Sequence, residues 1–145
     1  QSWQKVKIYT AQNDVNKILV NIDNEILMPL IFPYGNGIKW DGYTYFQLPD
    51  DDVRENTMHE YMDVNKPLTI GSLSFDRTLK VSERDNIDNI IDYNLGYKQY
   101  AENVGLIYDE QTDYLYLQEG GTIIGDKIIA SGKSTIRQII EYGKN

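Results

Sequence analysis

The sequence predicts a mainly β protein in which neighbouring strands run antiparallel, with at most one or two short helices. Among the apolar residues, eighteen Ile and twelve Tyr stand against three Ala. Ile and Tyr suit the pleated, half-buried surface of a sheet, whereas Ala is the best helix former. In the second half of the chain, turns of two or three residues separate the apolar segments. Strands joined so closely must be antiparallel neighbours.

The first predicted strand covers residues 3–10, where alternation places Val6 and Ile8 toward the core. Residues 17–22 keep the same two-residue period and are predicted as a second strand. Residues 13–22 also fit a short helix with an Asn or Asp cap at its start, so both alternatives stay open.

A hairpin turn at Asp23-Asn24 is predicted to lead into a third strand at residues 25–32. Pro29 in this strand cannot donate a backbone hydrogen bond, which favours an edge position or a bulge. The loop 32–37 follows, and residues 38–47 are predicted as an aromatic-rich strand that ends before a run of three Asp.

The remaining elements are predicted from the same alternation and from Gly, Asn and Asp at the turns. Strands are predicted at residues 58–64, 68–70, 73–75, 78–82, 95–101, 104–110, 114–118, 122–130 and 134–142. Turns are predicted at residues 71–72, 102–103, 111–113, 119–121 and 131–133. The polar segment 83–92 is predicted as a loop with apolar anchors or a single helical turn.

Composition indicates one domain, residues 1–145, and argues against two classes of binding partner. The net charge is −8 and the four Arg are dispersed, so the chain lacks the basic stripe that nucleic-acid binding needs. The same acidity disfavours anionic membrane surfaces. The absence of Cys excludes disulfides, thiolate catalysis and Cys-ligated zinc. A start at Gln1 rather than Met is expected of a trimmed or mature chain.

The residue types that carry catalysis do not form a pattern in this sequence. His59 is the only histidine, and it is interpreted as a packing or surface residue. Asp50-Asp51-Asp52 lacks the alternating acidic ligands of a calcium loop. Gly132-Lys133-Ser134 has Lys127 where a phosphate loop needs its first Gly. We therefore expect no enzymatic activity, no cofactor and no metal. A carboxylate-dependent hydrolase is a third alternative, because 22 acidic residues always allow some facing pair.

The aromatic residues of the predicted strand 38–47 are the candidate ligand-binding residues: Trp40, Tyr43 and Tyr45. Aromatic rows on a sheet can stack on sugars or line an apolar cavity. The same rows stabilise sheets through cross-strand pairs. Two functions follow: binding of an apolar or glycan ligand at these three residues, or a structural or protein-partner-binding role in which they belong to the core.

Three segments resemble a family of uncharacterised envelope lipoproteins of Gram-negative bacteria, related to the TapB family. They are Phe32-Pro33-Tyr34-Gly35 followed by Gly37 and Trp40, the hairpin Leu68–Asp76 with Leu79-Lys80-Val81, and Tyr100-Ala101-Glu102-Asn103-Val104-Gly105-Leu106-Ile107-Tyr108. The resemblance implies a single curved antiparallel sheet, a half-barrel or open barrel like that of lipoprotein carriers. It also implies export to the periplasm and anchoring to the outer membrane through a lipid-modified Cys that this sequence lacks. The partner would be an unknown ligand or envelope protein, and no substrate is implied.

Overall fold

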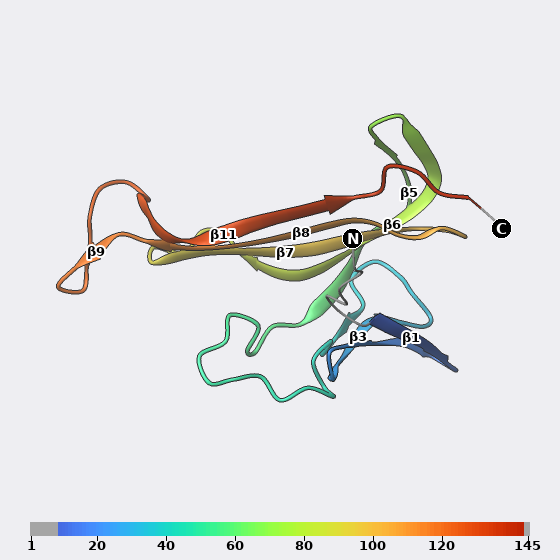
Figure 1. The fold of residues 1–145 in the computed structure, drawn as a ribbon, viewed down its shortest axis with the longest axis horizontal. Coiled ribbons are helices and arrows are strands. Elements are labelled where there is room, and N and C mark those ends of the chain that lie inside the picture. The colour runs from blue at the N-terminus through green and yellow to red at the C-terminus, as the bar shows by residue number, and fades with distance from the viewer. Residues whose placement is uncertain (1–8, 144–145) are drawn as a thin grey trace, which may run out of the picture.

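The computed structural model describes residues 9–143, which form eleven strands in three antiparallel sheets (Figure 1). The strands are β1 (Tyr9–Asp14), β2 (Lys17–Ile22), β3 (Glu25–Ile31), β4 (Lys39–Trp40), β5 (His59–Ile70), β6 (Leu73–Asn86), β7 (Asp92–Ala101), β8 (Gly105–Tyr116), β9 (Gln118–Glu119), β10 (Thr122–Ile123) and β11 (Ile129–Gln138). The predicted mainly β, antiparallel class is confirmed. Within residues 9–143 no helix is long and apolar enough to span a membrane. Most of the strand predicted at residues 3–10 lies outside the described residues.

The largest sheet has six strands in the order β11-β8-β7-β6-β5-β4 and is open at both edges. Its long central hairpin joins β5 to β6 and turns at Gly71-Ser72, as predicted. The far end of this hairpin curls away from the plane of the sheet (Figure 1). Register shifts between Met62 and Leu68, with positive φ at Asp63 and Asn65, explain the bend because bulges kink a strand.

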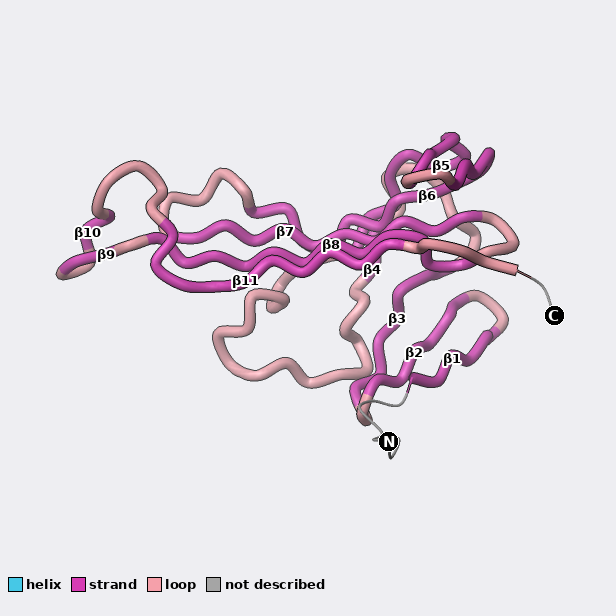
Figure 2. Tube along the Cα trace, turned by 45° about the horizontal axis from the view of Figure 1, so that its top comes forward, coloured by secondary structure: helices cyan, strands magenta, loops and turns pink. Residues whose placement is uncertain are grey.

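The three-stranded sheet β1-β2-β3 lies beside one face of the large sheet (Figure 2). Asp23 and Asn24 adopt positive φ values of 52° and 75°, which suit the predicted tight hairpin. The strand alternative for residues 17–22 is therefore correct and the helix alternative wrong. Strand β3 carries Pro29 at the edge of its sheet, as predicted. Two hydrogen bonds tie β3 to β4 and the residues just after it: Trp40 Nε1 donates to Met28 O at 2.8 Å, and Met28 N donates to Gly42 O at 2.8 Å.

The strand predicted at residues 38–47 is wrong beyond Trp40. Asp41 ends it, because its side-chain oxygen accepts the Tyr43 N–H at 2.8 Å and its carbonyl accepts the Thr44 hydroxyl at 2.9 Å. These local hydrogen bonds compete with strand pairing, so the chain turns away from the sheet after Trp40. Residues 41–58 instead form a long loop on the side of the large sheet that also faces the small one (Figure 2).

Several further boundaries differ from the prediction, three of them because polar residues occupy paired strands. The segment predicted as a loop at 83–92 begins inside β6, and the turns predicted at 111–113 and 131–133 lie inside β8 and β11. Gln111 pairs with Gly96, and the Thr112 hydroxyl contacts the Ser134 hydroxyl at 2.7 Å. The strand predicted at 122–130 is interrupted after Ile123 by turns with positive φ. The turns predicted at 102–103 and 119–121 are confirmed.

Two buried apolar clusters hold the strands together. One lies at the curled end of the hairpin and contains Ile70, Phe75, Ala101 and Ile107. The other contains Trp40, Tyr61 and Val81, against which Met28, Leu30 and Ile31 of β3 pack. The second cluster joins the two sheets, and both candidate sites described below border it.

Candidate functional site

A network of buried polar side chains lies on the face of the large sheet that loop 41–58 covers. We call it the buried network. Its buried members are His59 of β5, Glu83 and Arg84 of β6 and Asp109 of β8, and its half-buried members are Lys98 of β7 and Gln111 of β8. Alternation along a strand would place Glu83 and Arg84 on opposite faces. A register shift between Ser82 and Arg84 inserts an extra residue, so both side chains reach Gln111.

Glu83 is the centre of this network. Its carboxylate accepts a short hydrogen bond from Lys98 Nζ and another from Gln111 Nε2 at 2.8 Å. Gln111 Nε2 also donates to Asp109 Oδ1 at 3.0 Å, and Arg137 covers the other Asp109 oxygen. Burial opposes the charge on Glu83, but Lys98 and these hydrogen bonds outweigh it and lower the pKa of Glu83 below its usual value. The Glu83 carboxylate is therefore ionised at neutral pH.

His59 is only 2% exposed, which agrees with its interpretation as a packing residue. Its ring centroid lies 5.5 Å from that of Trp40 and 5.1 Å from that of Tyr43. Burial lowers the pKa of His59 to about 4, even though Glu83 on β6, 3.6 Å from Nε2, and Asp41 on the loop favour protonation. The positive charges of Lys98 and Arg84 also lower the pKa of His59. The ring is consequently neutral at pH 7 and shielded from any substrate.

The low pKa of His59 predicts a loss of stability in mild acid. Between the unfolded pKa of about 6.5 and the folded pKa of about 4, the unfolded chain binds a proton that the folded chain does not. The free energy of unfolding should fall by about 2 kcal/mol between about pH 7.5 and about pH 5. Urea unfolding at both pH values measures this loss. A His59→Gln variant should lose distinctly less over the same interval, and an equal loss in the variant would contradict the assignment.

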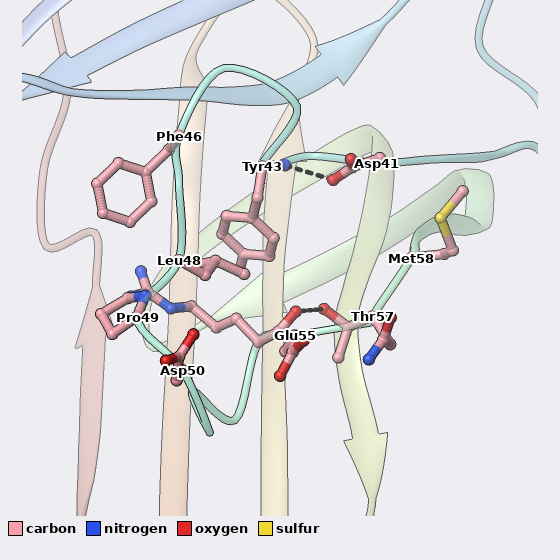
Figure 3. A pocket seen from close by; sticks show the side chains of 11 residues that line it. Asp41, Tyr43, Phe46, Leu48, Pro49, Asp50, Glu55, Thr57 and Met58 are labelled. Atoms are coloured by element: carbon pink, nitrogen blue, oxygen red, sulfur yellow. Dashed lines mark hydrogen bonds between the residues drawn. The ribbon is translucent and has the colours of Figure 1, made fainter.

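The three candidate ligand-binding residues lie in different environments. Trp40 and Tyr43 are 5% and 8% exposed and flank His59, whereas Tyr45 is 47% exposed. The Tyr45 hydroxyl accepts a hydrogen bond from Lys17 Nζ at 2.9 Å, away from the other two. Tyr43 also lines a cavity beside the loop, together with Phe46 and Leu48 (Figure 3). The structure therefore brings Trp40 and Tyr43 together around His59 and leaves Tyr45 apart.

An apolar groove of about 380 Å³ lies where the small sheet meets the large one. We call it the aromatic groove, and its walls include Leu30, Phe32, Tyr34, Tyr61, Leu79 and Tyr100. Tyr34 meets Phe32 and Tyr61 edge to face, with ring centroids 6.3 and 6.5 Å apart. Such edge contacts are the favoured geometry of aromatic pairs. They make a continuous wall from side chains far apart in the sequence.

Backbone hydrogen bonds hold this wall in place. The Tyr61 hydroxyl both donates to Ile31 O at 2.8 Å and accepts from Ile31 N at 2.9 Å. On the other side, Gly37 N donates to Tyr61 O at 2.9 Å, and Val64 N donates to Asn36 Oδ1 at 3.0 Å. The loop 32–38 is therefore anchored to β5, and the groove is preformed.

The inner end of the groove carries a polar group. The Tyr100 hydroxyl has no hydrogen-bond partner among residues 9–143. Burial raises the pKa of Tyr100 well above its usual range, and the nearby charges of Glu83 and Asp109 act in the same direction. The hydroxyl keeps its proton and is available as a donor. At the outer rim, Arg77 bonds to Glu102 at 3.0 Å and to Asn65 at 3.2 Å.

The prediction from sequence missed Tyr61 as a groove residue and the charged members of the buried network. Asp109, Gln111 and Asp113 share one face at the two-residue spacing of a strand, which is the signal that would have found part of it. No protein family, curated protein or solved structure matches the chain. Its function therefore has to be argued from its own geometry.

Proposed function

We propose that this protein is a non-enzymatic binding module that holds an apolar small molecule in the aromatic groove. The observation that carries the proposal is the combination of aromatic walls with the hydroxyl of Tyr100, which burial keeps protonated. Small-molecule sites are typically concave, mostly apolar and supplied with a few polar groups that fix orientation. The ligand would then be an apolar body with one hydrogen-bond acceptor or amine.

The groove has the dimensions and the rim that such a ligand needs. Its volume of about 380 Å³ lies within the range of small-molecule pockets. The Arg77–Glu102 ion pair at its mouth is exposed on both sides, and such pairs contribute less than about 1 kcal/mol. Displacing this pair during entry therefore costs little, whereas burying the ligand's apolar surface is favourable.

The same groove supports the proposed place in the bacterial envelope. All three segments that resemble the lipoprotein family contribute residues to its walls: Phe32–Gly35, the second segment through Leu79, and Tyr100–Tyr108. We propose that the protein is an exported lipoprotein held at the outer membrane by a lipid anchor, in which the curved end of the sheet serves ligand binding. A catalytic role is not proposed, because His59 is enclosed by Trp40 and Tyr43.

Fluorescence titration with N-phenylnaphthylamine, an apolar dye with one N–H group, tests the proposal. Wild-type protein should give saturable, one-to-one enhancement of dye fluorescence. Tyr34→Ala should weaken binding about tenfold, because it removes a ring from the wall. Tyr100→Phe should weaken it several-fold by removing only the hydroxyl.

Tyr45→Ala is the matched control, because Tyr45 is about as exposed as Tyr34 but lies outside the groove. Its dye affinity should equal that of the wild type. The proposal fails if the dye shows no saturation, or if Tyr34→Ala binds as tightly as Tyr45→Ala.

A second candidate function is partner binding without a small-molecule ligand. The observation that favours it is β11, which forms an edge of the large sheet and is exposed along all ten residues. The free backbone groups of an edge strand can pair with a strand of another protein. Burial of Trp40 and Tyr43 in the joint between the sheets also fits a structural role for these aromatic residues.

A further inference from the structure

The large sheet has one long edge that no strand in the described part of the chain covers. Strand β11 pairs only with β8, beside which it runs almost straight, and all ten of its residues are exposed (Figure 1). The opposite edge is β4, which is two residues long and is held to β3 through the Trp40 indole. Folded proteins usually shorten, cover or distort their edge strands, so an open edge of this length is a template for another strand.

The outer side of β11 has the regular geometry that an added strand needs. From Ser131 to Gln138 its pairing with β8 is unbroken, and its register shift lies at the other end, between Ile129 and Ser131. The strand contains no proline, and most side chains at residues 130–136 are small. Its outer backbone N–H and C=O groups can therefore pair with an extended segment, and such main-chain hydrogen bonds supply affinity.

The charges of β11 differ from those of the chain as a whole. The strand carries Lys133 and Arg137 and no acidic residue, although the net charge of the chain is −8. Its register places these two cations opposite Asp113 and Asp109 of β8. Asp109 is bonded to Arg137, whereas Asp113 is bonded to Arg84 of β6 at 3.1 Å. Lys133 is therefore left without an ion-pair partner among residues 9–143.

These cations determine which kind of strand can be added. A second copy of this chain would bring the same two cations to the shared edge, where their repulsion opposes pairing. Lysine on an edge strand is one of the devices by which proteins prevent self-association. A strand with a carboxylate opposite Lys133 instead forms an ion pair there, so the charges favour an acidic partner over a second copy.

Strand β8 shows which sequence pattern fits beside β11. Its carboxylates Asp109 and Asp113 stand four residues apart, at the spacing of the two cations that they face. An antiparallel strand on the outer side of β11 would meet the same two cations at the same spacing. On the other face of β11, Ile136 is 56% exposed, so an apolar residue opposite it would remove apolar surface from water.

We propose that β11 binds an extended acidic segment of a partner protein, which joins the large sheet as an antiparallel strand. The segment carries one carboxylate opposite Lys133, a second opposite Arg137 and an apolar residue opposite Ile136. Lys133 contributes most of the charge recognition, because Arg137 is already bonded to Asp109. This inference rests on the second candidate function, whose partner class it names, and it is independent of the aromatic groove.

A ten-residue peptide with the sequence of residues 106–115, in which valine replaces the glutamate that pairs with Ile136, tests the proposal. At saturating peptide, amide hydrogen exchange should show added protection in residues 129–138 of the full chain. Lys133→Glu should weaken peptide binding about tenfold, because it replaces an ion pair by repulsion. A second peptide with lysine in place of the aspartate opposite Lys133 should bind Lys133→Glu more tightly than it binds the wild type, a reversal that misfolding cannot produce.

Lys66→Glu makes the same charge change at an exposed position of β5, near the other edge of the sheet, and should keep wild-type affinity for the first peptide. Methylation of alternate peptide nitrogens should abolish binding in one of the two alternating patterns and spare it in the other, because a paired strand presents every second amide to its neighbour. Binding of N-phenylnaphthylamine should be equal in Lys133→Glu and the wild type, which separates this site from the aromatic groove. The proposal is overturned if the first peptide does not bind, if both methylated peptides bind equally, if Lys133→Glu binds the first peptide like the wild type, or if sedimentation shows a dimer that the peptide dissociates.

Discussion

Gly42→Ala is expected to lower the free energy of unfolding by about 3 kcal/mol, although it adds a single methyl group. A Cβ at this position would stand 2.3 Å from both Cε1 and Nε2 of His59. The imidazole cannot move aside, because Trp40 and Tyr43 pack against it and Glu83 lies 3.6 Å from Nε2. The added methyl group must therefore displace the loop, the ring or both.

The loss should disappear when the ring is removed. His59→Ala alone leaves a cavity and is itself destabilising. In the double variant Gly42→Ala/His59→Ala, the new methyl group occupies part of that cavity, so the two losses should not add. Urea unfolding of the four proteins in this cycle measures the coupling. Additive losses would show that the contact between Gly42 and His59 is not the cause.

Gly35→Ala provides a matched control in a neighbouring loop. Its added Cβ would meet only the flexible end of Ile38, at 3.3 Å, and no positive φ is required there. The expected change is below about 1 kcal/mol. The comparison separates the specific clash at His59 from a general effect of replacing loop glycines.

The sequence predicted the strands correctly where apolar and polar residues alternate between turn residues. The hairpins at Asp23-Asn24 and Gly71-Ser72 were predicted correctly, because turn residues separate apolar strands. Segment 111–113 was predicted as a turn, because Gln111, Thr112 and Asp113 form a polar run. In the structure these side chains hydrogen-bond within the sheet, so polarity there indicates buried pairing and not solvent.

The sites were harder to predict because local irregularities create them. Glu83 and Arg84 share a face only through a bulge, and a strict two-residue period would separate them. The aromatic groove combines Tyr34, Tyr61 and Tyr100, which lie on three segments that no local pattern connects. The selection of Trp40, Tyr43 and Tyr45 assumed one continuous strand, and the turn at Asp41 divides that segment.

Glu83→Gln is expected to have the second large effect, a loss of about 3 kcal/mol or more in the free energy of unfolding. Removing one partner of a buried ion pair leaves the other charge uncompensated, which is far more costly than removing an exposed pair. In Glu83→Gln the Lys98 ammonium loses its carboxylate, and Gln111 loses its charged acceptor. The lowered pKa of Glu83 supports this expected loss, because it shows that the network stabilises the ionised carboxylate.

Glu60→Gln is the matched control for this change. Glu60 lies on the adjacent strand β5 and pairs with exposed Lys39 at 3.2 Å, so its replacement should cost less than about 1 kcal/mol. The double variant Glu83→Gln/Lys98→Met should recover part of the loss, because it removes the unpaired ammonium as well. Urea unfolding at about pH 7.5 compares all three variants. If Glu83→Gln costs no more than Glu60→Gln, the network contributes no more than a surface ion pair, and the face under loop 41–58 is held by the joint around Trp40 and Tyr61 alone.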